Sequence, residues 1–117
     1  MAGLSSGSLV VTNCPPTSLY SSISRLWEAV QSGATETETV ILRARARLAA
    51  AHAATASVQA VDIVHRLAGT SALFRTNPLE RQFRDIHTSA AHVMIGPLIY
   101  EAAGRVELGR PAEFPFF

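Results

Sequence analysis

The stretch NPLERQFRDIHTSAAH, residues 77–92, brings several reactive side chains close together in the sequence. It contains an Arg-Asp pair, Arg84 and Asp85, and two histidines, His87 and His92. Histidine is the side chain that most readily gives or takes a proton near neutral pH, and it can donate a hydrogen bond to a developing negative charge. Proton transfer and anion stabilisation are therefore the chemistry that this stretch offers.

Zinc binding does not fit the spacing of these histidines. A helical zinc site places two histidines four residues apart on one face. His87 and His92 are five residues apart and diverge by about 140° around a helix. Cys14 is the single cysteine, which excludes a cysteine cluster and an internal disulfide and fits a reducing compartment. We predict no metal site, and we interpret Cys14 as a bystander thiol.

The same stretch begins with the sequence of a helix start. Asn77 suits the N-cap, Pro78 the first helical position and Glu80 the third. The helix is expected to continue until the Gly-Pro pair at residues 96 and 97 breaks it. Successive offsets of four, three and four residues place one set of side chains on a common face: Arg81, Asp85, Thr88 and His92.

The Arg-Asp pair also has a structural interpretation. Asp85 is expected to form an ion pair with Arg81 or with an arginine of another helix. His87 points to another side of the helix and is interpreted as a surface or structural histidine. His92, beside the Gly-Pro break, is the better candidate for chemistry, because the break is expected to leave space around His92 for a substrate.

Two helices are predicted upstream. The first ends at Gly33 and carries an apolar face formed by Leu19, Ile23, Leu26, Trp27 and Val30. Thr35 and Glu38 predict a capping box for the second, which meets no Gly or Pro until Gly69. At 1.5 Å per residue this helix of about 33 residues is roughly 50 Å long, too long to be buried in a lone small globule. It requires long helical partners, which its many alanines allow to approach closely.

Polar positions on the second helix have mostly structural interpretations. One narrow sector is interpreted as a polar stripe at a subunit surface; it contains His52, Gln59, Asp62 and Arg66. His65 lies outside this sector beside apolar residues and is interpreted as a core histidine. The arginines at positions 43, 45 and 47 form either a solvated group or an anion patch.

The predicted fold class is all-α, a long-helix up-and-down bundle that forms oligomers. Residues 1–16 are a flexible tail or cut edge, in which the paired prolines are expected to stop any regular element. Residues 17–110 form the helical domain, whose fourth segment starts at Pro97 and runs to about Leu108. Residues 111–117 are a non-helical C-terminal tail. Strand alternation and internal repeats are missing from the sequence.

Charge excludes two classes of partner. Ten arginines, no lysine and nine acidic residues give a formal net charge of +1, which indicates neither nucleic acid nor a membrane surface as a partner. The N-terminus lacks the charged region and long apolar core of a signal peptide. The chain is therefore predicted to be cytoplasmic.

The segment LAGTSALFRTNPLERQFRDIHTSAAH resembles the C-terminal helical domain of the acyl-CoA dehydrogenase superfamily. The pattern is a glycine-rich turn followed by a proline-started helix that bears Arg-Asp, and YEAAGR and ELG within residues 100–109 fit the next segment. The resemblance covers roughly residues 17–110. It implies a partial four-helix bundle, without the N-terminal helical domain, the middle β-domain and the first long helix of the complete enzymes.

The resemblance also bears on catalysis. Dehydrogenases of this family commonly carry YEGT after this helix, with the catalytic glutamate eight residues beyond the Asp of Arg-Asp. Val93 stands at that position and cannot act as a base. His92 is similar to a histidine of the two-component flavin-dependent monooxygenases, which bind reduced flavin and hydroxylate aromatic substrates; there it lies beside flavin and substrate.

By this resemblance His92 is the catalytic candidate and Arg84 and Asp85 are structural. The turn at Gly69 and Thr70, with Arg66 before it, is implied to approach the flavin of a neighbouring subunit. The alternative is that Gly69 is simply a helix C-cap.

The function implied is the C-terminal bundle of a flavin-dependent monooxygenase, supplying subunit contacts and part of the flavin and substrate site. One alternative is an acyl-CoA dehydrogenase proper with its base elsewhere; another is a non-catalytic helical assembly module. Flavin, as FAD or FMN, is expected in the complete enzyme and not in this chain alone, which is expected to be inactive. A homo-oligomer, dimer or tetramer, and a flavin reductase are the expected partners.

Overall fold

The computed structural model describes residues 15–117, and every regular element in this part of the chain is helical. The elements are α2 (Pro15–Gln31), α3 (Glu36–Ala68), the 3-10 turn η1 (Gly69–Leu73), α4 (Pro78–Ala90) and α5 (Leu98–Glu107). The predicted all-α class is confirmed. Residues 1–14, including Cys14 and most of the expected N-terminal tail, lie outside the described part.

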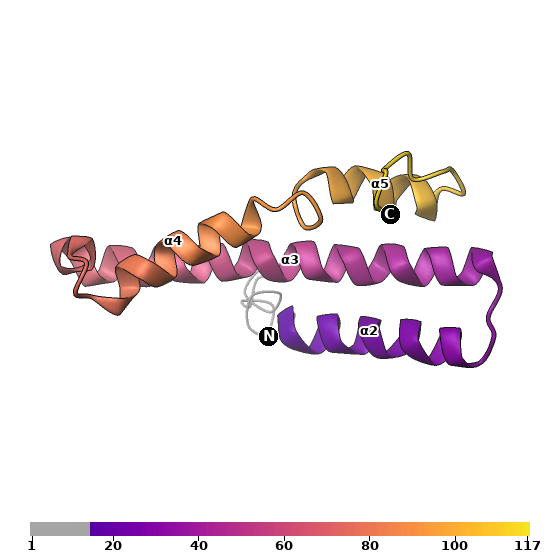
Figure 1. Cartoon of the computed structure of the whole chain (residues 1–117), viewed down its shortest axis with the longest axis horizontal. Helices are drawn as coiled ribbons and strands as arrows, with labels where there is room; N and C mark the ends of the chain where they lie inside the picture. Colours follow the sequence, from indigo (N-terminus) through magenta and orange to yellow (C-terminus); the bar gives the residue numbers. More distant parts are fainter. Residues whose placement is uncertain (1–14) are drawn as a thin grey trace, which may run out of the picture.

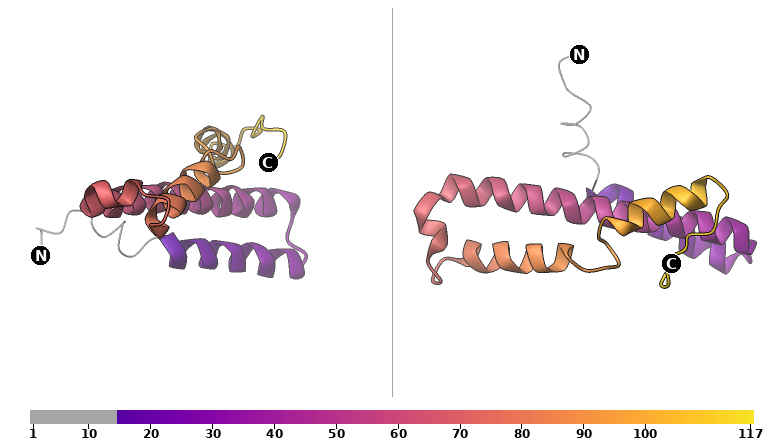
Figure 2. Two further views of the ribbon diagram at one scale, coloured as in Figure 1. Left: turned by 60° about the vertical axis from the view of Figure 1, so that its left-hand side comes forward. Right: turned by 90° about the horizontal axis from the view of Figure 1, so that it is seen from above.

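Helix α3 is the longest element, and the other helices pack along it. α2 runs antiparallel to its N-terminal half, α4 runs antiparallel to its C-terminal half, and α5 lies over the half that α2 also contacts (Figures 1 and 2). The predicted capping box starts α3: the Thr35 hydroxyl accepts from the Glu38 N–H at 3.3 Å, and the Glu38 carboxylate accepts from the Thr35 N–H at 3.0 Å. The predicted up-and-down order is confirmed for α2, α3 and α4, and α5 continues in the direction of α4 (Figure 1).

The core along α3 consists mainly of alanine. Ile99 is the one large side chain that is fully buried among the described residues, and the other buried apolar residues are small except Val106. They are Ala44, Ala46, Ala51, Ala56, Ala72, Ala102 and Ala103. The radius of gyration is 17.2 Å, against about 13 Å for a compact domain of this length. The chain therefore buries little of its apolar surface by itself.

Helix α2 differs from the sequence-based expectation in its start and in its apolar face. α2 begins at Pro15, so the paired prolines open a helix and do not stop it. Proline is compatible with the first helical turn because the N–H that it lacks would have no partner there. The expected apolar face of α2 is also split: Leu19 and Leu26 are half-buried toward α3, whereas Trp27 is 65% exposed.

Helix α4 ends earlier than predicted. Its last residue is Ala90, with Ala91 as C-cap, so His92 does not lie on the helical face shared by Arg81, Asp85 and Thr88. Pro97 has no N–H for the carbonyl of Val93, and its ring would collide with that carbonyl if the helix continued. The chain therefore leaves the helix before the Gly-Pro pair and enters a turn.

The C-terminal tail is irregular, as predicted, but it packs on the helices. Arg47 donates to the Phe116 carbonyl and Arg43 donates to the Phe117 carbonyl at 3.3 Å. The Phe117 side chain packs on a buried cluster of α3 and α5 residues. Burial, and then the charge of Arg43, lower the pKa of Arg47. The arginines predicted as a solvated group or an anion patch thus partly serve to hold the tail.

Candidate functional site

His92 lies in the turn between α4 and α5. Its N–H donates to the Ser89 carbonyl at 3.1 Å, and its own carbonyl accepts from the Ile95 N–H at 3.0 Å. Its ring is exposed, and Nδ1 lies 3.2 Å from the Met94 N–H. Because Nδ1 accepts this bond, a neutral ring carries its proton on Nε2. His92 therefore presents an N–H donor outward.

A cavity borders the Gly-Pro break beside this turn. It has a volume of about 380 Å³, and its polar lining comes from Thr55, Gln59 and Tyr100 among mostly apolar residues. The cavity lies at the break, but the His92 side chain does not line it, so it is not the space that the sequence predicted around His92. Gly96 lines the cavity and also lies against the turn that contains His92: a Cβ at this position would lie 3.4 Å from the His92 carbonyl oxygen.

The glycine turn after α3 has the geometry of a helix cap. Gly69 has φ 62° and ψ −144°, and its N–H donates to the Arg66 carbonyl. Positive φ favours glycine at this position. No heavy atom lies within 4 Å of a Cβ built there, and Arg66 and Thr70 are exposed. The turn is thus an open surface that presents the guanidinium of Arg66 and the hydroxyl of Thr70, whereas the Ser71 hydroxyl donates to the Ala68 carbonyl.

The structure does not bring the two candidate regions together. Gly69 and Thr70 precede α4, and His92 follows it (Figure 1). The 13 residues of α4 span about 20 Å. If both regions contact flavin, they contact different parts of the cofactor or different flavin molecules, as the expected contact with a neighbouring subunit requires.

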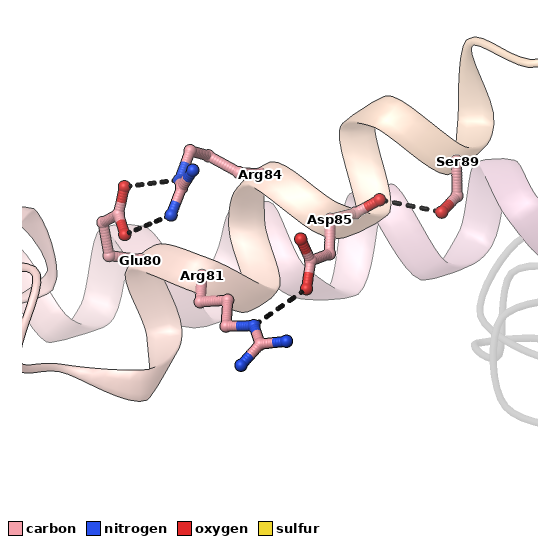
Figure 3. Close-up of polar contacts among 5 residues, drawn as sticks. All are labelled: Glu80, Arg81, Arg84, Asp85 and Ser89. Atoms are coloured by element: carbon pink, nitrogen blue, oxygen red, sulfur yellow. Dashed lines mark hydrogen bonds and ion pairs between the residues drawn. The ribbon is translucent and has the colours of Figure 1, made fainter.

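The Arg-Asp pair forms its ion pairs within α4 (Figure 3). Arg84 Nε lies 2.7 Å from Glu80 Oε1, and Arg81 Nε lies 3.5 Å from Asp85 Oδ2. Both pairs join residues four apart, and the arginine side chains are 66% and 80% exposed. Arg81, one of the two expected partners of Asp85, is confirmed. Within this chain the pairs support α4 itself, and a contact of Arg84 and Asp85 with another helix remains a prediction.

The polar contact between α3 and α4 comes from His87, not from the Arg-Asp pair. His87 Nε2 lies 3.2 Å from Asp62 Oδ1, and Nδ1 lies 2.9 Å from the Phe83 carbonyl oxygen. Phe83 also stacks on His65 with 4.4 Å between ring centroids. Asp62 is the member of the predicted polar stripe that meets the neighbouring helix, and His65 is half-buried against an aromatic ring.

Metal and membrane sites are not found in the described residues. No group of three histidine, cysteine or carboxylate side chains is arranged to hold a metal ion in residues 15–117. Among the helices of this part, none is both long enough and apolar enough to cross a bilayer.

Residues 17–97 match the family model for the C-terminal domain of acyl-CoA dehydrogenases. The chain belongs to this family. It is also similar to an indole-3-acetate monooxygenase of Pseudomonas putida, at 29% identity over 91 residues, which cover 78% of this chain and 23% of that protein. The matched part of this chain thus spans about a quarter of the length of this relative. No solved structure gives a significant match.

Proposed function

We propose that the chain is the C-terminal bundle of a flavin-dependent monooxygenase, in which it supplies subunit contacts and one part of the flavin and substrate site. The observation that carries this proposal is His92. Its exposed ring has Nδ1 engaged by the Met94 N–H, so Nε2–H is free to donate. Such a donor stabilises negative charge that develops on an oxygen atom.

The neighbouring residue favours oxygenation over acyl-CoA dehydrogenation. Val93 occupies the position at which the resemblance expects the catalytic glutamate of dehydrogenases, and valine cannot take a proton. The similar protein is named as a monooxygenase of indole-3-acetate, which supports the same choice. An acyl-CoA dehydrogenase whose base lies outside this chain is the first alternative.

The residues of the turn fit a partial contact with flavin. A flavin, as FAD or FMN, would supply the redox chemistry when bound in the complete enzyme. The guanidinium of Arg66 and the hydroxyl of Thr70 are exposed donors, and the open space at Gly69 allows a close approach to the backbone. These residues enclose nothing by themselves, so we expect no flavin on this chain alone and no turnover by it.

The partners in this proposal follow from the thin core. A chain whose buried residues are mostly alanine leaves large apolar side chains on its surface. Exposed apolar surface of this kind favours association with another chain. We propose a homo-oligomer, dimer or tetramer, located in the cytoplasm, with a flavin reductase as a separate partner that delivers reduced flavin. A non-catalytic helical assembly module is the second alternative, because it would use the same surface without the chemistry.

The test uses the complete protein in which this domain occurs. It is supplied either with reduced flavin, oxygen and indole-3-acetate or with an acyl-CoA and an electron acceptor. The proposal expects a hydroxylated aromatic product in the first assay and no oxidation in the second. Oxidation of the acyl-CoA alone would support the dehydrogenase, and failure to bind flavin at all would support the assembly module.

A further inference from the structure

Both ring nitrogens of His87 face an acceptor. Nδ1 lies 2.9 Å from the Phe83 carbonyl oxygen and Nε2 lies 3.2 Å from the Asp62 carboxylate. A carbonyl and an ionised carboxylate only accept hydrogen bonds, and a neutral imidazole has only one N–H. Both contacts are therefore hydrogen bonds only when the ring carries two protons and a positive charge.

The aromatic neighbour favours the same state. The ring of Phe83 lies 4.2 Å from the ring of His87 between centroids, and 4.4 Å from the ring of His65 on α3. A cation within about 6 Å of an aromatic centroid is attracted by the negative face of the ring. The His87 and Asp62 side chains are 39% and 30% exposed, so solvent weakens the ion pair only in part.

Helix α4 packs on α3 through half-buried side chains, among them Leu79, Phe83 and Ile86. None of its residues is buried. The four buried residues of α3 lie between positions 44 and 56, before the segment that contains Asp62. Among the polar contacts of residues 15–117, the bond from His87 to Asp62 is the one that joins the side chains of α4 and α3. A single protonation event thus bears on the attachment of the whole helix.

We propose that His87 is a positioning residue, whose doubly protonated ring clamps α4 onto α3 through Asp62 and Phe83. The clamp weakens when one proton leaves, because a ring protonated only on Nε2 keeps the bond to Asp62 but loses its charge and its bond to the Phe83 carbonyl. α4 joins the turn at Gly69 to the turn that contains His92, so the clamp determines where both turns lie. The proposal rests on contacts within this chain, so it does not depend on the proposed function.

The pH dependence follows from the charges around the ring. From α3 the neighbouring ionisable groups are Asp62 and, across Phe83, His65. On α4 itself Arg84 is held by Glu80, and η1 contains no ionisable side chain. The clamp is present while His87 is protonated and Asp62 is ionised. It weakens when the ring gives up one of its two protons, and also when acid protonates the carboxylate.

Amide hydrogen exchange of α4 in the 117-residue chain tests the clamp. After correction for the intrinsic effect of pH, the opening equilibrium of the α4 amides should rise about fivefold to tenfold between about pH 6 and about pH 8. Asp62→Asn should show the raised value already at the lower pH, with no further change. Asp85→Asn, the same change in an exposed pair within α4, should keep the pH dependence of the unmodified chain.

His87→Arg separates this clamp from the titration of His65. A permanent guanidinium can bond Asp62 at both pH values, so its α4 amides should stay protected at the higher pH. Exchange of α2 and α5 amides in each variant reports that the rest of the chain is folded. Equal opening of the unmodified chain at both pH values would overturn the proposal, as would a pH dependence that persists in Asp62→Asn or in His87→Arg.

Discussion

Arg45 on α3 and Glu107 at the end of α5 form a two-bond ion pair, with 2.8 Å from Nε to Oε1 and 3.4 Å from Nη2 to Oε2. The pair fastens the end of α5 to the N-terminal half of α3. The hydrogen bond from Arg45 lowers the pKa of Glu107 from the ordinary 4.5; burial opposes this shift, and the charge of Arg45 adds to it least. α5 is therefore held in part by an ionised carboxylate.

Acid should remove the stabilisation from this pair. Because the folded pKa of Glu107 is depressed, its contribution is complete above about pH 4.5 and is lost as the pH falls through the folded pKa. We expect Glu107→Gln to lower the thermal unfolding midpoint at pH 6, with a difference that shrinks toward pH 3. Glu28→Gln, an exposed change on α2, is the control. A Glu107→Gln difference that does not vary with pH would contradict the assignment.

A pair of glycine substitutions should change stability in opposite directions. Gly69 has φ 62°, which alanine adopts only with strain, so Gly69→Ala should cost about 1 to 2 kcal/mol of unfolding free energy. Gly104 lies within α5, and a Cβ there meets nothing within 4 Å. Gly104→Ala should therefore stabilise the chain by about 0.5 to 1 kcal/mol. Chemical denaturation measures both, and a neutral Gly69→Ala would show that the turn relaxes without glycine.

Self-association should depend on the outer face of α2. Four large apolar side chains at helical spacing are exposed there, namely Tyr20, Ile23, Trp27 and Val30. Sedimentation at tens of micromolar should give a dimer or tetramer. Trp27→Glu should shift it to monomer, whereas Ser21→Glu, on another side of α2, should leave it unchanged. A monomer before any substitution, or equal behaviour of the two variants, would be evidence against this surface.

The starts of α3 and α4 could be predicted, because the residues that mark each start lie close together in the sequence. Thr35 with Glu38, and Asn77 with Pro78, mark helix starts by contacts that span three residues or fewer. The family, too, could be recognised from the glycine turn and the Arg-Asp helix. The end of α4 was mispredicted because the effect of Pro97 reaches back to the carbonyl four residues earlier, so the helix ends before the Gly-Pro pair.

Contacts between distant residues could not be predicted. Asp62 and His87 are 25 positions apart in the sequence, and their approach depends on how the hairpin of α3 and α4 closes. The docking of the C-terminal tail on Arg43 and Arg47 spans still more of the chain. The one available signal was that these two arginines share a helix face with no acidic residue four positions away.

His92 should supply a hydrogen-bond donor to oxygen in the complete enzyme. Its Nε2–H is free because Nδ1 accepts from the Met94 N–H, so His92→Ala should remove one donor to oxygen. Loss of such a donor typically lowers a rate by about 10²-fold or more. Hydroxylation per reduced flavin should fall accordingly, and the oxygen consumed should appear as released hydrogen peroxide. His92→Gln, which keeps an amide N–H, should recover part of the coupling.

The control for this experiment is Thr88→Ala, one turn earlier on α4, where the side chain is also exposed. It removes a polar side chain near the same turn without touching the His92 ring, so hydroxylation per reduced flavin should stay at the level of the unmodified enzyme. Circular dichroism should show unchanged helix content in each variant. If His92→Ala and Thr88→Ala hydroxylate equally, His92 is only a surface histidine of the turn, because a donor that acts on the reacting oxygen cannot be removed without loss of rate.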